Sequence, residues 1–174
     1  MRWLRGRSGR WPAHLDRDTR EQLGIGPRER ILGWGMALGT DGSRYPMAAT
    51  DRALYGSSLA RGVPWDAFSK ATWDEPILGL TATVAGTVQT EQVELIEPGL
   101  LPAAVRTQVT ESVVIAERLD LGQGRGAQAI ARRHGPDGDV RWTIAFDPGT
   151  DPSDPQLRAR ADLALAELRS TLGI

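Results

Sequence analysis

Apolar and polar residues alternate along most of this chain, and a period of two residues is typical of half-buried β-strands. In the first predicted strand, four large side chains share one side: Leu32, Trp34, Met36 and Leu38. The same alternation predicts further strands around 45–55, 63–68, 78–84, 92–96, 113–121, 127–133 and 140–146. In the second of these, Thr50-Asp51 interrupts the apolar pattern and predicts a kink or bulge. The pattern therefore predicts seven or eight antiparallel strands.

Two stretches change to helical spacing. Leu101, Val105 and Val109 recur every four residues, which predicts a helix over 100–110, inserted after the fifth strand. An amphipathic helix is predicted over 154–172, where its apolar stripe must pack against the preceding sheet.

Capping residues mark the ends of the predicted helices. Ser153 or Asp154 is suited to the N-cap of the last helix, with Pro155 at its first position and Gly173 after its end. A shorter helix is predicted over 16–23 with Asp16 as its N-cap.

Composition narrows the classes of protein that fit. The 174 residues contain no cysteine, which excludes disulfides, thiolate metal sites and cysteine nucleophiles. No apolar run approaches the 18 or so residues that span a membrane, and the N-terminus lacks the apolar core of a secretory signal. We therefore expect a cytoplasmic protein without a transmembrane segment.

Residues 1–14 differ from the rest, because they are rich in arginine and contain no acid. Such a segment buries too little apolar surface to fold by itself, so the sequence predicts a flexible basic arm followed by a single domain over 15–174. In the arm, cations alternate with indoles: Arg2, Trp3, Arg5, Arg7, Arg10 and Trp11. Arginine contacts phosphates and tryptophan stacks on bases, so this pattern favours contact with RNA, while a solvated tail is the simpler interpretation.

Two motifs resemble the bacterial pleckstrin-homology-like (PH-like, GRAM-like) superfamily. Thr50-Asp51-Arg52-Ala53-Leu54-Tyr55 looks like its T-(D/N)-R-x-L second strand, and Val63-Pro64-Trp65-Asp66 looks like the start of its third strand. The chain is also similar to an uncharacterised actinobacterial family, through the motifs Leu101-Pro102, Ser112-Val113-Val114 and Asp151–Pro155.

The resemblance implies a mostly β (α+β) fold, a bent, partly open antiparallel barrel of seven to eight strands. It further implies that the C-terminal helix plugs one end of this barrel, while the helix near 100–110 is an addition to the minimal fold. It also implies a module that binds proteins through loops, an edge strand and a helix flank. The loop 39–44 offers only Arg44 as a cation, which argues against phosphoinositide binding, since clamping a phosphate needs convergent cations.

Several groups of residues suggest a catalytic, metal or nucleotide site, but each has a simpler structural explanation. Asp51 and Arg52 are an acid–base candidate, yet a carboxylate at a strand kink usually accepts backbone N–H groups. His134 with Asp137 and Asp139 is a weak metal candidate in a turn. The segment 122–126 (GQGRG) lacks the spacing of a dinucleotide fingerprint.

Two further candidates concern calcium and acyl transfer. Asp147, Asp151 and Asp154 depart from the spacing of a calcium loop. Ser57 and Ser58 lack a nucleophile elbow. We therefore predict no catalytic, metal or cofactor site and no cofactor.

The sequence favours a non-catalytic binding or scaffold module that acts through contacts with a protein partner or with itself. Trp65 and Trp73, together with Trp34, are the candidate anchors, although a small barrel also needs large residues for its core. The alternative is an RNA- or ribosome-associated protein that contacts its target through the N-terminal arm.

Overall fold

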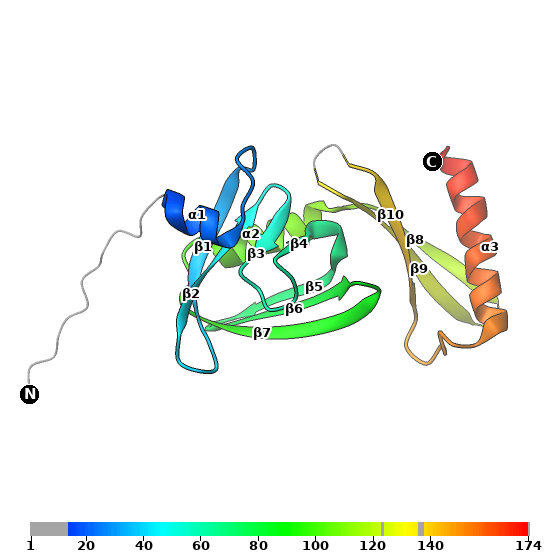
Figure 1. The fold of residues 1–174 in the computed structure, drawn as a ribbon. Helices are drawn as coiled ribbons and strands as arrows, with labels where there is room; N and C mark the ends of the chain where they lie inside the picture. The colour runs from blue at the N-terminus through cyan, green and yellow to red at the C-terminus, as the bar shows by residue number, and fades with distance from the viewer. Residues whose placement is uncertain (1–13, 123, 136–137, 174) are drawn as a thin grey trace, which may run out of the picture.

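The computed structural model describes residues 14–122, 124–135 and 138–173, and within them the fold is mostly β. Ten strands form two antiparallel sheets, which lie side by side (Figure 1). The larger sheet has the order β4-β3-β2-β1-β7-β6-β5. Its strands are β1 (Ile31–Leu38), β2 (Arg44–Thr50), β3 (Ala53–Tyr55), β4 (Gly62–Pro64), β5 (Phe68–Asp74), β6 (Ile77–Val84) and β7 (Thr87–Glu97).

The smaller sheet has the order β10-β9-β8 and follows the larger one in the chain. Its strands are β8 (Val113–Gly122), β9 (Arg125–Arg133) and β10 (Val140–Phe146). The helices are α1 (Arg17–Leu23), α2 (Leu101–Glu111) and α3 (Pro155–Leu172), with a short 3-10 helix η1 (Trp65–Ala67). The prediction of one shell closed by the last helix is wrong, because α2 packs on the larger sheet and α3 packs on the smaller one.

Helix α2 has the predicted spacing and covers the inner face of the larger sheet. Leu101 and Val105 are fully buried, and they join the main core with Leu54, Phe68 and Leu80. The prediction that α2 follows the fifth strand is wrong, because β2–β3 is a hairpin and β5 is a further strand.

The side of β1 that faces α2 is made of small residues, not of the large ones that the alternation suggested. Gly33, Gly35 and Ala37 are buried, whereas Trp34 and Met36 on the other face are only half-buried. A Cβ on Gly33 would lie 2.6 Å from the carbonyl oxygen of Leu100. The helix therefore approaches the strand closely because these side chains are absent, and the hydrophobic alternation could not show this.

The predicted kink at Thr50-Asp51 is a hairpin turn, so the single strand expected over 45–55 is two strands. The Thr50 hydroxyl accepts the backbone N–H groups of Arg52 (3.1 Å) and Ala53 (3.0 Å) and so closes the turn. The carboxylate of Asp51 accepts the backbone N–H of Arg30 at 3.0 Å, which secures the turn to the start of β1. A hydroxyl that bonds its own chain two and three residues on reverses the chain rather than kinking it.

A buried polar network links the segment before β1 to β2 and β3. One carboxylate oxygen of Glu29 accepts the Tyr55 hydroxyl (2.8 Å), and the other accepts the Thr50 hydroxyl (2.7 Å). Burial, followed by this hydrogen bond, raises the pKa of Tyr55 to about 12.

This pKa predicts how stability depends on pH. Since the pKa of Tyr55 in the folded protein lies above its ordinary value of 10, its contribution to stability is complete below pH 10 and is lost as the pH rises through 12. We expect the difference in unfolding free energy between wild type and Tyr55→Phe, measured by urea titration, to be constant up to pH 10 and to shrink between pH 10 and 12. A difference that stays constant over that interval contradicts the network.

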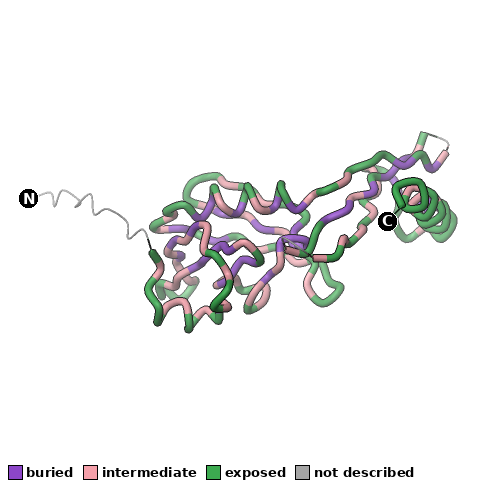
Figure 2. Tube along the Cα trace, turned by 90° about the horizontal axis from the view of Figure 1, so that it is seen from above, coloured by how far each residue is buried: buried purple, intermediate pink, exposed green. Residues whose placement is uncertain are grey.

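Helix α3 begins and ends as predicted. Asp154 is its N-cap and accepts the backbone N–H of Gln156 at 2.8 Å, Pro155 opens the helix, and Gly173 ends it with φ 72°. Leu157 and Ala161 are buried against the smaller sheet, while most of the helix is exposed (Figure 2).

The two sheets are joined around Asp66, which lies in η1. Its buried carboxylate contacts Nδ1 of His134 at 2.8 Å and Nε of Arg141 at 3.2 Å, and both residues come from the β9–β10 hairpin. Arg132 of β9 donates to the Val109 carbonyl (2.9 Å) and to the Ser112 hydroxyl (2.7 Å), at the C-terminal end of α2. These contacts connect the smaller sheet to both η1 and α2.

Candidate functional site

A groove with a volume of about 790 Å³ lies between α2 and β5. We call it the α2–β5 groove. This volume falls within the range of about 300–1,000 Å³ that is typical of ligand sites. Its lining is largely apolar, with Trp73 and Leu78 on one side and Pro98, Pro102 and Val105 on the other.

Two elements position this groove. The turn at Pro98-Gly99 leads directly into α2, whose first turn contains Pro102, a position where proline needs no backbone N–H partner. Strand β5 forms the opposite wall and is the last strand of the larger sheet, paired only with β6. An edge strand leaves alternate backbone N–H and C=O groups without a strand partner.

Charged and polar groups also line the groove. Glu75 and Arg106 are exposed and contribute one charge of each sign, and Thr72 and Thr107 contribute hydroxyls. An apolar floor with a few polar groups is suited to holding an apolar side chain and orienting the chain that carries it.

The three candidate tryptophans have different environments. Trp65 is 2% exposed and donates its indole N–H to the Thr50 carbonyl at 2.9 Å, so it is a core residue. Trp34 is half-buried and packs in a small cluster with Ile25 on the outer face of the sheet. Trp73 is half-buried and lines the α2–β5 groove, so it is the anchor candidate that a ligand can reach there.

The other candidate site residues belong to the N-terminal segment. Arg2, Trp3, Arg5, Arg7, Arg10 and Trp11 lie outside the residues that the structure describes. The contact with RNA or the ribosome predicted for them stays a prediction.

The acid–base candidates have structural partners. Asp51 accepts a backbone N–H, and Arg52 is exposed, as the structural interpretation of this pair predicted. Of the metal candidates, His134 pairs with Asp66, a residue distant in sequence, and Asp137 lies outside the residues that the structure describes. Across residues 14–122, 124–135 and 138–173, no group of three or more His, Cys, Asp or Glu side chains could hold a metal ion.

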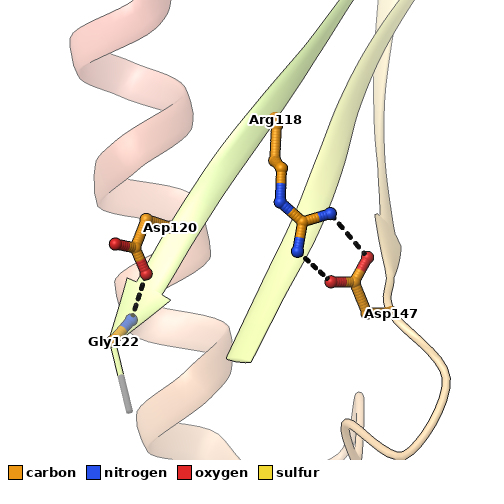
Figure 3. Close-up of polar contacts among 4 residues, drawn as sticks. All are labelled: Arg118, Asp120, Gly122 and Asp147. Atoms are coloured by element: carbon orange, nitrogen blue, oxygen red, sulfur yellow. Dashed lines mark hydrogen bonds and ion pairs between the residues drawn. The ribbon is translucent and has the colours of Figure 1, made fainter. Parts of the chain in front are cut away.

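The acidic residues near α3 also have structural partners. Figure 3 shows the guanidinium of Arg118 facing the carboxylate of Asp147, with Nη2 and Oδ2 2.7 Å apart. This pair crosses β9 at Gly126, where a Cβ would lie 2.7 Å from both groups. Asp151 accepts the N–H and hydroxyl of Ser153, which lower the pKa of its carboxyl. These acidic residues therefore close a turn and form an ion pair across the smaller sheet, which explains their spacing.

The glycine-rich segment connects two strands, as predicted. Gly122 ends β8 and Gly124 precedes β9, both with positive φ (79° and 73°), and the Asp120 carboxylate accepts the Gly122 N–H at 2.8 Å (Figure 3). No helix follows this segment, so the arrangement differs from that of a dinucleotide-binding loop.

Sequence reasoning missed two features. It did not identify Asp66 as a buried partner of His134 and Arg141, although an acid between apolar Trp65 and Ala67 is a signal of burial. It also did not predict the groove, because the α2 residues and β5 residues that line it are about 30 positions apart and meet only in the folded chain.

No protein-family model, curated protein or solved structure matches this chain. In the part of the chain that the structure describes, no helix has the length and apolar composition needed to cross a membrane.

Proposed function

We propose that this protein is a non-catalytic binding module that takes a short, extended segment of a protein partner into the α2–β5 groove. The observation that carries the proposal is the position of an apolar groove of about 790 Å³ beside an edge strand. A peptide that adds to such an edge gains main-chain hydrogen bonds, while the groove selects its side chains.

The chemistry of the groove defines the segment. Trp73 and Val105 suit a large aliphatic or aromatic side chain, and Glu75 and Arg106 give each end of the groove wall a charge for a polar residue that flanks the anchor. One buried apolar anchor with a polar surround is the usual distribution of binding energy in a small interface.

The order of the elements supports the proposal as well. The resemblance to PH-like domains implied about seven antiparallel strands closed by the C-terminal helix, with the helix near 100–110 as an addition. In the structure the helix that follows the seven strands and packs on their sheet is α2, so the two helices exchange these roles. We therefore propose that the β1–β7 sheet with α2 is a PH-like domain and that the smaller sheet with α3 is an addition to it.

Filling the groove tests the proposal. Thr107 and Thr110 are both exposed on α2, but only Thr107 lines the groove. We expect peptides of about 12 residues, selected from a random display library on the wild-type protein, to share a large apolar residue. We expect Thr107→Trp to weaken their binding at least about tenfold, since a bulky side chain occupies the anchor site.

Thr110→Trp is the matched control, because it places the same indole on the same helix outside the groove. We expect it to leave the dissociation constant, measured by fluorescence anisotropy, unchanged within about twofold. Selected peptides that bind both variants equally, or a library that yields no enriched sequence, contradict the proposal.

A further inference from the structure

The two sheets have four edge strands, and β10 differs from the other three. Natural proteins protect sheet edges with short strands, proline, lysine, bulges or a covering helix. Strand β4 has three residues and ends in Pro64, and β8 has two register shifts and packs against α3. Strand β5 has a register shift and Lys70 at its start, which leaves only its second half, beside the α2–β5 groove, regular. Strand β10 has seven residues and pairs with β9 without a register shift.

The composition of β10 offers little protection either. Its sequence VRWTIAF contains one charged residue, Arg141, and no proline or lysine. Thr143 and Ala145 near its middle are exposed. A long, regular edge with these properties is a template for pairing with another strand.

The apolar face of the smaller sheet is incompletely covered along this same strand. Helix α3 packs mainly against β8, at the opposite edge. Trp142, Ile144 and Phe146 of β10 point to the α3 side, yet all three remain only half-buried. A row of large apolar residues that stays partly exposed along an edge strand favours an interaction surface.

We propose that this surface binds a second copy of the chain, through antiparallel pairing of β10 with β10 about a two-fold axis. The pairing would join the two three-stranded sheets into one six-stranded sheet. Residues that face each other across the pairing must both be even-numbered or both be odd-numbered, because a shift by one residue would put the apolar row of one copy on the polar face of the other.

Side-chain complementarity favours a second copy over an unrelated strand. When the axis passes at Ile144, Trp142 lies opposite Phe146 of the second copy, and each Ile144 lies opposite its equivalent. Aromatic and β-branched pairs of this kind stabilise antiparallel sheets. The same register places Arg141 opposite Asp147 of the second copy, but these two side chains already contact Asp66 and Arg118 within each copy, so the apolar pairs carry the complementarity.

The expected affinity is modest. Pairing of one strand and one row of side chains buries less than the roughly 1,600 Å² of a standard stable interface, so we expect a dissociation constant on the order of 1–100 μM. Sedimentation equilibrium of the full chain across that range should show a monomer–dimer equilibrium. A monomer at every concentration overturns the proposal.

A lysine on the edge tests the surface. Thr143→Lys introduces the residue that natural edges use against pairing, and its exposed position keeps it out of the core. We expect it to raise the dissociation constant at least about tenfold. Thr83→Lys, the same change at an exposed position of β6, should leave that constant unchanged. A dimer that Thr143→Lys leaves intact overturns the proposal.

Cross-linking tests the register and does not depend on the lysine variant. The chain has no cysteine, so an introduced thiol reports one position. Pairing about Ile144 places Thr143 opposite Ala145 of the second copy, within the Cα separation of about 4.4–6.8 Å that a disulfide spans. We expect an oxidised mixture of Thr143→Cys and Ala145→Cys to form more disulfide-linked dimer than Thr83→Cys. Equal yields contradict the pairing.

Discussion

Gly33→Val is expected to lower the free energy of unfolding by about 3 kcal/mol, because α2 leaves no room for a side chain at this position of β1. A Cβ on Gly33 would lie 2.6 Å from the carbonyl oxygen of Leu100 and 3.0 Å from the Cβ of Ala104. The first of these is a backbone atom at the start of the helix, so it cannot move as a flexible side chain would. The helix must shift away from β1, which would withdraw its own fully buried Leu101 and Val105 from the core.

Urea unfolding followed by circular dichroism measures this effect. Thr83→Val is the control, since it adds the same β-branched side chain on an exposed face of β6 and should change the unfolding free energy by less than about 0.5 kcal/mol. The helix shift would also distort the α2–β5 groove, so peptides selected on the wild type should bind Gly33→Val more weakly. A Gly33→Val protein as stable as the control would mean that α2 does not lie against β1.

Removing both exposed partners of Asp66 is expected to destabilise the protein by about 2 kcal/mol or more, although neither partner is itself buried. The side chain of Asp66 is fully buried, whereas those of His134 and Arg141 are more than half exposed. In the double variant His134→Ala/Arg141→Ala, the carboxylate stays in the interior, and Arg132, with which it interacts electrostatically, remains. The penalty comes from leaving a buried charge poorly compensated, and not from losing two surface residues.

Neutralising the acid separates these two causes. If the buried charge is responsible, the triple variant that adds Asp66→Asn should be more stable than the double variant, because an amide is less costly to bury than an unpaired carboxylate. Chemical denaturation of wild type, double and triple variants gives the order. A triple variant less stable than the double would show that Asp66 contributes through other contacts.

Local patterns in the sequence determined most of the elements. The hydrophobic period predicted strands that correspond to β1, β6, β9 and β10, and the spacing of Leu101, Val105 and Val109 predicted α2. The caps of α1 and α3 could be predicted because each capping side chain bonds a backbone N–H only two or three residues away, as Asp154 does with Gln156. Interactions within a few residues depend on the local sequence and need no knowledge of the fold.

Only the tertiary structure decided how these elements combine. The Thr50 hydroxyl closes a hairpin turn where the sequence predicted a kink. Helix α2, and not α3, packs on the larger sheet, where Gly33 leaves room for the start of the helix. Likewise, Trp65 is a core residue and Trp73 a groove residue, although the sequence indicated both as candidate anchors. The groove and the Asp66 cluster join residues about 30 and about 70 positions apart, and such contacts depend on chain packing, which hydrophobic periodicity does not encode.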